Sequence, residues 1–357
     1  MKAQKYDLVR VIGLVRDVVR KKAMIPALEC VLVKDGYFTG SNGELTVQAW
    51  LDDAIGESFL LPASMMDMIK TLPDGEVEIT CDADNVLTLE AGRIRQRCQS
   101  FSVDDYAYYR TDVDYDNEIT LPGEAIMSSI SRVAYAAAEK EGMTVMNGIY
   151  FEVSDGKLNV VALDGHVIAW DMISYDGVSD MKVIVPKGAA QKLASLGIVD
   201  TVSISYNRAS IIFRSGDYTV SSRLLAGQYF KFKNVFQGDW EHTVTVDRKA
   251  IAESMKRAKL CLPADKNAKK PVVFSMDDDV LSLTLMSDHS DYEEQLEVHR
   301  DRKDGFRIGF DPVLVEKSLA AFGDAEVVMH FINKKAPMLI EEDASPFRAL
   351  VLPVNLI

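Results

Sequence analysis

The chain contains one unit three times, and this repetition restricts the folds it can adopt more than any other feature. A short apolar strand, a break and an amphipathic helix recur at Phe59 to Leu72, Val183 to Leu196 and Ile308 to Ala321. The spacings are 124 residues (59 to 183) and 125 residues (183 to 308). Nearly equal spacing without obvious identity is expected of three copies of one domain fold.

Each copy also begins with a helix-like segment. Apolar residues at helical spacing, such as Leu8, Ile12, Val15 and Val19, mark the first one. The three predicted helices are Leu8 to Lys22, Ala125 to Lys140 and Ala250 to Cys261. Two alternating strands joined by a turn follow each helix, at Ala27 to Val33 and Tyr37 to Trp50, Gly148 to Val153 and Leu158 to Met172, and Val272 to Met276 and Leu281 to Val298.

We therefore predict an α+β protein of three tandem domains with largely antiparallel sheets. Polar, Asp-rich segments interrupt the periodic pattern at Asp112 to Glu118 and at Gln237 to Asp239. These segments place the domains at residues 1–117, 118–243 and 244–357. Asp35-Gly36 and Asp155-Gly156 favour tight hairpin turns in the first two domains.

Composition excludes several classes of protein. The chain has 357 residues, 48% of them hydrophobic, and no apolar run long enough to cross a bilayer. The N-terminus lacks a signal-peptide pattern, so we expect a cytoplasmic protein with no membrane partner. The four cysteines are far apart and the five histidines show no ligand spacing. We expect reduced thiols, no metal site and no cofactor.

Asp164-Gly165-His166 is the first candidate for chemistry. In an extended segment residues i and i+2 share a face, so Asp164 and His166 could form an acid–imidazole pair. The chain has no G-x-S-x-G elbow, no P-loop and no G-x-G-x-x-G fingerprint to complete a catalytic site. We therefore expect no catalytic residues.

Basic residues recur on or just after the first helix of each copy, although the net charge of the chain is −14. Solvated helix faces explain any one of these residues, but the recurrence in three copies favours a shared positive surface. Such a surface contacts phosphates without reading bases. The predicted DNA-facing residues are Arg10, Arg16, Arg20, Lys22, Arg132, Lys140, Lys187, Lys256 and Arg257.

Rows of a single charge occur in the first and third copies. Arg93, Arg95 and Arg97 alternate along a probable strand, so they project from one face of it. The third copy carries a short acidic segment, and opposite rows suit a head-to-tail contact between two chains. The predicted dimer-interface residues are Arg93, Arg95, Arg97, Asp288, Asp291, Glu293 and Glu294.

With the three copies recognised, the sequence resembles the beta subunit of the bacterial replicative DNA polymerase, DNA polymerase III, which is a sliding clamp. The order and spacing of matching segments carry the resemblance over essentially the whole chain. These segments are Met24 to Leu28, Leu61 to Ala63 with Leu72-Pro73, Phe151 through Asp164 to His166, Val183 to Lys187, Ile308 to Phe310, and Leu350 to Val354.

The resemblance implies a non-catalytic processivity factor, built as a homodimeric ring with helices inside and sheets outside. The ring would encircle double-stranded DNA without sequence preference, and its partners would be the replicative polymerase, a clamp loader and other proteins with clamp-binding motifs. The Asp-Gly-His turn and the apolar C-terminus would line a groove for short peptides. The pocket residues carried over are Met146, Leu163, Gly165, His166, Val167, Ile168, Leu352, Pro353, Val354 and Leu356.

The sequence departs from the family pattern near this groove. Val167 stands where an Arg usually follows Asp-Gly-His, and prolines expected near Phe230 and Gln237 are absent. Asn355 stands where a basic residue is common, and Ile357 is an extra residue at the end. These changes leave the expected fold unaffected, but they leave the peptide preference of the groove open.

Two rival classes remain open from the residues alone. An enzyme that uses Asp164 and His166 would lose its activity on His166→Ala and would need a deep pocket. A structural, self-assembling protein accounts for the repeats but leaves the basic helices unexplained. Release from DNA circles when they are linearised would distinguish a sliding clamp from both.

Overall fold

The structure, a computed structural model, describes residues 1–106, 115, 117–139, 142, 145–263, 270–288 and 290–356. The chain forms two compact units, residues 1–127 with 192–224 and residues 128–191 with 225–357. The middle repeat contributes to both units. Because this division follows contacts and not repeats, it does not test the predicted domain boundaries at 117 and 243, which stay a prediction. Most of the predicted linker at Asp112 to Glu118 lies outside the described residues.

Each repeat has two α-helices, as the periodicity predicts. The first helices are α1 (Lys5–Arg16), α3 (Gly123–Val133) and α5 (Arg248–Leu260), and the second are α2 (Ala63–Thr71), α4 (Lys187–Ala194) and α6 (Pro312–Leu319). Short 3-10 helices are η1 (Pro26–Glu29), η2 (Asp52–Ala54), η3 (Val103–Asp105), η4 (Ala134–Ala136) and η5 (Phe232–Phe236). Within the described ranges, no helix is long and apolar enough to span a membrane.

The first unit holds two antiparallel sheets. The four-stranded sheet has the order β1 (Lys2–Gln4), β6 (Glu76–Cys81), β7 (Val86–Ala91) and β8 (Ile94–Gln99). The eight-stranded sheet has the order β5 (Ser58–Leu61), β2 (Val31–Lys34), β3 (Tyr37–Ser41), β4 (Leu45–Trp50), β16 (Tyr218–Arg223), β15 (Ser210–Ser215), β14 (Thr201–Tyr206) and β9 (Asn117–Pro122). Strands of the first and second repeats therefore share one sheet, joined at β4 and β16.

The second unit repeats this plan one domain later. Its nine-stranded sheet has the order β13 (Lys182–Pro186), β10 (Gly148–Ser154), β11 (Lys157–Leu163), β12 (Val167–Ser174), β25 (Arg348–Val351), β24 (Met338–Glu341), β23 (Glu326–Phe331), β17 (His242–Asp247) and β21 (His299–Arg300). Its four-stranded sheet has the order β20 (Asp291–Glu297), β19 (Val280–Met286), β18 (Val272–Asp277) and β22 (Phe306–Phe310). Here β12 and β25 join the second and third repeats.

Three segments that the alternation predicts as single strands are hairpins. Tyr37 to Trp50 folds as β3 and β4, Leu158 to Met172 as β11 and β12, and Leu281 to Val298 as β19 and β20. Glycines explain the first two breaks, because Gly43 and Gly165 have φ of +87° and +88°. The hairpin turns expected at Asp35-Gly36 and Asp155-Gly156 are confirmed, with positive φ at all four residues.

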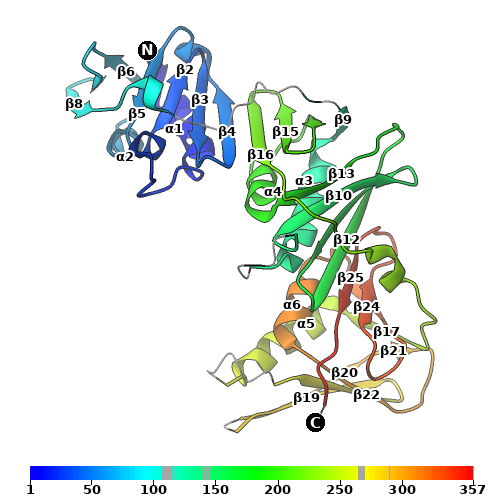
Figure 1. The fold of residues 1–357 in the computed structure, drawn as a ribbon. Helices are drawn as coiled ribbons and strands as arrows, with labels where there is room; N and C mark the ends of the chain where they lie inside the picture. The colour runs from blue at the N-terminus through cyan, green and yellow to red at the C-terminus, as the bar shows by residue number, and fades with distance from the viewer. Residues whose placement is uncertain are drawn as a thin grey trace. The chain divides into compact units, whose positions relative to one another are not determined.

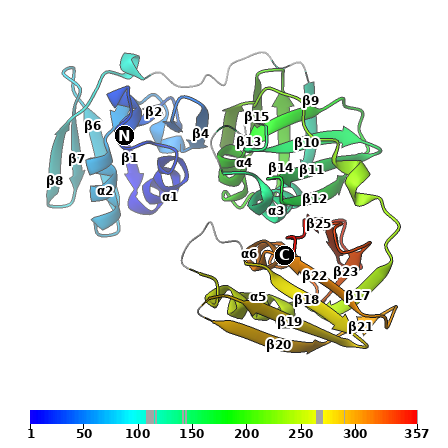
Figure 2. The ribbon, with the colours of Figure 1, turned by 60° about the horizontal axis from the view of Figure 1, so that its bottom comes forward.

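Helices cover the sheets closely. Figure 1 shows α1 beside β2, β3 and β4, and Figure 2 shows α5 beside β19 and β20. The helix α6 packs against α5 and β25. The contact of α1 with β3 depends on a glycine, because a Cβ at Gly40 would lie 2.1 Å from the Val15 carbonyl oxygen. Backbone therefore meets backbone at this point.

We predict that Gly40→Ala destabilises the protein by about 1–3 kcal/mol, because the added methyl group must push helix backbone away from the strand. Gly13→Ala, on the exposed side of the same helix with nothing within 4 Å, is the matched control. It should be stabilising by about 0.5–1 kcal/mol. Urea unfolding of both variants measures the difference, and equal midpoints would contradict the close packing of α1.

Candidate functional site

The Asp164-Gly165-His166 segment is a turn between β11 and β12. The Asp164 carboxylate oxygen Oδ1 accepts hydrogen bonds from the backbone N–H groups of His166 (2.8 Å) and Val167 (3.0 Å). The segment is therefore not extended, and the expectation that Asp164 and His166 share a strand face is wrong. The backbone N–H of Leu352 donates to the His166 carbonyl oxygen at 2.9 Å, which brings the C-terminal segment beside the turn.

Strand alternation divides the predicted pocket residues between two faces. Leu163 lies opposite Ile168, which lies opposite Leu350, and all three are buried in one apolar cluster. Val167 pairs with Val351 and is fully buried. Neighbouring residues of a strand point to opposite faces, so Val167 lies behind the surface on which Leu163 and Ile168 are found. Its assignment as a pocket wall is corrected accordingly.

The C-terminal segment leaves β25 with exposed apolar residues. Leu352 and Leu356 are 37% and 43% exposed, and Pro353 and Val354 are partly exposed. The backbone N–H of Val354 donates to the Gly309 carbonyl oxygen of β22 at 2.8 Å. The tail is thus held against the third repeat while its larger side chains face solvent. Ile357 lies outside the described residues.

Aromatic residues that the sequence analysis did not assign lie on the same cluster as Leu163. Trp170 meets the rings of Phe232 and Phe236 edge to face, at centroid distances of 5.1 and 5.0 Å. Tyr229 is also buried in the cluster, and Met146 packs against it. The i, i+4 spacing of the two phenylalanines is a helical signal, and it lies just before the segment that we took as a linker.

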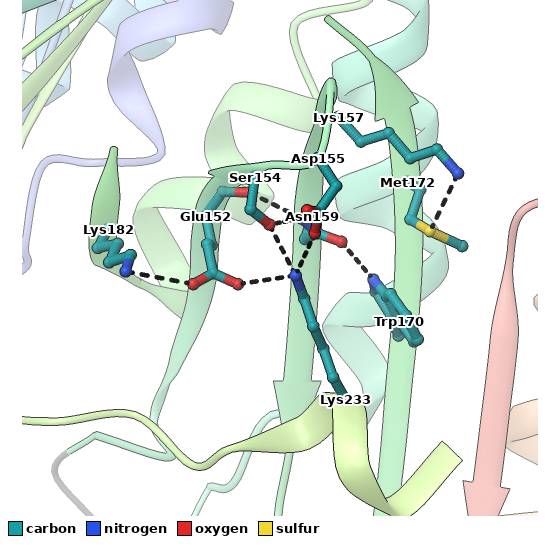
Figure 3. A network of polar contacts seen from close by, with 9 residues as sticks. All are labelled: Glu152, Ser154, Asp155, Lys157, Asn159, Trp170, Met172, Lys182 and Lys233. Carbon is teal, nitrogen blue, oxygen red and sulfur yellow. Dashed lines mark hydrogen bonds and ion pairs between the residues drawn. The ribbon is translucent and has the colours of Figure 1, made fainter. Parts of the chain in front are cut away.

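A lysine holds η5 in this position. Lys233 Nζ lies 2.8 Å from Ser154 Oγ, 3.0 Å from Asp155 Oδ2 and 3.8 Å from Glu152 Oε2 (Figure 3). The hydrogen bond from Lys233 lowers the pKa of Asp155. These contacts attach η5 to the end of the β10–β11 hairpin.

A buried asparagine extends the network to the cluster. Asn159 donates from Nδ2 to Ser154 Oγ, and its Oδ1 accepts from Trp170 Nε1, both at 3.0 Å (Figure 3). Asn159 is 2% exposed, so the indole N–H depends on this acceptor. The network therefore fixes the orientation of the ring on which Phe232 and Phe236 pack.

The basic residues of α1 are paired with acids. Arg16 Nη1 lies 2.6 Å from Asp67 Oδ1 on α2, and this hydrogen bond lowers the pKa of Asp67. Arg10 Nε lies 3.9 Å from Asp7 Oδ1. Their charges are partly compensated within the fold.

Other predicted DNA-facing residues are open to solvent. Arg20 and Lys22 are exposed in the loop after α1. Lys256 is exposed on α5 and lies 2.6 Å from Glu253, one turn earlier on the same helix. Lys140 lies outside the described residues.

Arg132 and Lys187 are engaged within the second unit. Arg132 Nη1 donates to Ser345 Oγ at 3.2 Å and lies 3.9 Å from the buried carboxylate of Asp171. Lys187 Nζ contacts Glu139 Oε1 at 2.9 Å and is only 16% exposed. Both side chains are directed to partners in the fold, which weakens the prediction that they contact DNA.

The two charged rows lie on or beside edge strands, but Arg93 is in the turn before β8, which begins at Ile94, so the prediction that it alternates along a strand with Arg95 and Arg97 is wrong. In the described part of the chain β8 pairs only with β7, and β20 pairs only with β19. Arg93, Arg95 and Arg97 are all exposed, and Arg95 Nε lies 3.1 Å from Glu90 of β7. Asp291 and Glu293 are exposed on alternate positions of β20. The predicted rows thus have free strand edges beside them.

Glu294 departs from this pattern, because it faces α5. It accepts hydrogen bonds from Arg257 Nε (3.0 Å) and Nη2 (2.6 Å) and also contacts the Tyr292 hydroxyl. The bonds from Arg257 lower the pKa of Glu294, and burial raises the pKa of Tyr292 to about 12. Asp288, in the loop before β20, is exposed and lies 4.0 Å from Lys270.

Three family models match nearly the whole chain. The N-terminal, central and C-terminal domains of the DNA polymerase III beta subunit match residues 1–110, 120–231 and 233–355. The chain belongs to the DNA polymerase III beta subunit family. The beta sliding clamp of Streptococcus pneumoniae strain R6 is 23% identical over 365 residues, and the alignment covers 96% of this chain and 96% of the relative. That of Synechocystis is 25% identical over 324 residues, 83% of this chain and 82% of the relative.

Solved structures show the same fold. The sliding clamp of Pseudomonas aeruginosa bound to griselimycin superposes with a TM-score of 0.92 at 23% identity, covering 100% of this chain and 99% of that one. The beta subunit of Streptococcus pyogenes gives a TM-score of 0.92 at 22% identity, with 99% of each chain covered. The protein is thus a DNA sliding clamp, a non-catalytic processivity factor that works with DNA and a polymerase.

We predict that Asn159→Ala costs about 1–3 kcal/mol, because it leaves the Trp170 indole N–H buried without its acceptor. Lys157→Ala is the control: Lys157 is exposed, and its ammonium contacts Met172 Sδ only at 4.0 Å. Thermal unfolding, together with tryptophan fluorescence, reports both effects. Equal stability of the two variants would show that the network does not hold the cluster.

Proposed function

We propose that two copies of this chain close head to tail into a ring around double-stranded DNA, through β8 of one copy and β20 of the other. A clamp loader places the ring on DNA in the cytoplasm. The ring then tethers the replicative polymerase and offers its groove to other proteins with clamp-binding motifs. The observation that supports the ring is a register shared by the two strand junctions within the chain.

Both junctions between repeats are antiparallel pairs of strands. In the first unit, β4 of repeat one pairs with β16 of repeat two, with Gln48 opposite Thr219. In the second unit, β12 of repeat two pairs with β25 of repeat three, with Trp170 opposite Arg348. In the described part of the chain, β8 of repeat one and β20 of repeat three are edge strands as well, each with one paired neighbour.

Gln48, Trp170 and Glu293 hold the same place in the three repeats. In each repeat, we start from the residue three positions before the second helix and move to the residue paired with it on the neighbouring strand. Two further moves of the same kind, each to the next strand of the sheet, lead to these residues. The starting residues are Leu60, Ile184 and Gly309.

Thr219, Arg348 and Arg95 are equivalent in the same way. Here we start from the residue three positions before the first helix of each repeat. Three successive moves, each to the paired residue on the next strand, lead to these residues. The starting residues are Thr120, Thr245 and Lys2.

Transferred to β20 and β8, the shared register sets Glu293 opposite Arg95. Because the pairing is antiparallel, Asp291 then lies opposite Arg97. Opposite charges directly across a strand pair are favourable, and a shift by one residue would lose both contacts. A head-to-tail contact of this kind closes into a ring when the rotation between copies permits it.

Duplex DNA would contact the exposed cations near the first helices. Arg20, Lys22 and Lys256 lie at the surface with flexible side chains, which suits exchangeable contacts with phosphates. Because Arg16 and Arg10 are paired with acids, contact with DNA through them must compete with an ion pair. Such contacts are weak and do not read sequence, which permits sliding.

Partner peptides would bind where the Asp164 turn, the tail and the aromatic cluster meet. Leu352 and Leu356 offer exposed apolar contacts, and the buried cluster of Leu163 and Ile168 forms the base. An extended peptide with one or two apolar anchors fits such a surface.

Arg95→Glu should yield folded monomers, because it sets two carboxylates opposite each other in the proposed register. Glu293→Arg in the same chain should restore the dimer, since the swapped charges again face each other. Sedimentation at low micromolar concentration measures the dimer. Retention on closed circular DNA, and release on linearisation, measures the ring.

A dimeric Arg95→Glu variant that stays on circles as well as the parent would show that β8 is not the closing edge. Rescue by Glu297→Arg in place of Glu293→Arg would instead indicate another register. Equal thermal unfolding of all variants is the control for folding.

Ending the chain at Pro353 should abolish binding of polymerase and clamp loader with little change in stability. The deletion removes Leu356 and the hydrogen bond from Val354 N–H to the Gly309 carbonyl oxygen, but none of the strand pairing of β25, which ends at Val351. Val178→Ser, at a fully exposed apolar residue outside the predicted groove, is the control. Undiminished processive synthesis by the truncated protein would contradict the groove.

A further inference from the structure

Arg257 connects α5 to the free edge strand β20. Its guanidinium donates two hydrogen bonds to Glu294, at 3.0 and 2.6 Å, and its Nη2 lies 3.4 Å from Ser254 Oγ. The Tyr292 hydroxyl lies 3.1 Å from the Ser254 carbonyl oxygen and also contacts Glu294. Two residues of β20 are thus attached to one turn of α5.

The second repeat has the same arrangement at its own junction. Arg132 and Arg257 are each the tenth residue of the first helix of their repeat. Asp171 and Glu294 each follow the equivalent residues Trp170 and Glu293. Arg132 lies 3.9 Å from Asp171, so an arginine faces the carboxylate of the edge strand in both repeats.

Arg132 shows which contacts the arginine makes when the strand beside its helix is paired with the next repeat. Besides Asp171, it bonds Ser345 Oγ at 3.2 Å and lies over the Phe347 ring at 6.0 Å. Ser345 and Phe347 belong to the turn that leads into β25, the strand paired with β12. One guanidinium therefore holds its own edge strand and the neighbouring repeat together.

The first repeat shows that packing a helix on the sheet does not require the arginine. The tenth residue of α1 is Leu14, and the strand position equivalent to Asp171 is Ala49, which is fully buried. Neither residue carries a charge, so no ion pair joins α1 and β4 at these two positions. The arginine–carboxylate contact between helix and strand thus occurs at the junction of repeats two and three and at the free edge of repeat three.

We propose that Arg257 is a positioning residue for ring closure and not a contact for DNA. It holds β20 so that Asp291 and Glu293 face outward, and it reaches the second copy near Ile94, the equivalent of Phe347. The inference rests on the proposed pairing of β20 with β8. It reassigns Arg257 from the predicted DNA-facing residues.

The physical reason is the conformational freedom of an edge strand. With one neighbour, β20 can twist or fray. Pairing with a second strand restricts it to one conformation, and the conformational entropy lost in this way opposes pairing. A bidentate arginine–carboxylate contact fixes both position and orientation. The hydrogen bonds from Arg257 lower the pKa of Glu294, which favours the charged form of this carboxylate.

The test compares Arg257→Ala with Lys256→Ala, its neighbour on the same exposed helix surface. We expect Arg257→Ala to weaken dimerisation about tenfold, the scale of a partly exposed ion pair that orders a strand. Amide hydrogen exchange in β20 should become faster. Lys256→Ala should leave dimerisation unchanged and reduce the salt dependence of DNA binding.

Arg257→Lys separates positioning from charge. Lysine keeps the positive charge but cannot form the bidentate contact, so this variant should dimerise nearly as poorly as Arg257→Ala. Full dimerisation of Arg257→Ala, with DNA binding weakened as in Lys256→Ala, would overturn the inference while Arg95→Glu still yields monomers. A monomeric parent protein would overturn the proposed ring instead.

Discussion

The architecture depends on hydrogen bonding between the edge strands of successive repeats. An unpaired edge exposes a row of backbone N–H and C=O groups, and a second strand satisfies them with little need for particular side chains. In this chain β4 pairs with β16 and β12 pairs with β25, and these two pairs join successive repeats. Both pairs have one register, and the proposed ring continues this register from β20 of one copy to β8 of the next.

The charges of the side chains differ between the internal junctions and the free edges. At the internal junctions the paired residues are largely apolar or uncharged, such as Val47 opposite Val220 and Ala169 opposite Ala349. At the free edges arginines and acids take these places. Internal junctions form within one chain. In the proposed ring the outer edges must stay soluble before they pair with each other, a role that charge serves better than apolar surface.

The Asp-Gly-His turn has a structural role for its carboxylate. Asp164 uses one carboxylate oxygen to close the turn, with two backbone N–H groups as donors. A carboxylate that holds the backbone in place stabilises the turn, beside which we propose that the apolar tail and the aromatic rings bind partner peptides. The departures from the family pattern at Val167 and Phe230 fall here: Val167 is buried behind the strand, and Phe230 is 48% exposed.

The sequence by itself determined the features that depend on local geometry. Spacing showed three repeats, helical periodicity located the helices, and alternation placed Arg95 and Arg97 on one exposed face. It misjudged Tyr37 to Trp50 and its counterparts, because a strand and a hairpin share the same alternation and differ only at the turn. Only the tertiary structure decided which edges pair, that Val167 is buried, and that Arg257 holds Glu294. These depend on hydrogen bonds and contacts between residues far apart in sequence, and no local period records which distant partner a strand or side chain will meet.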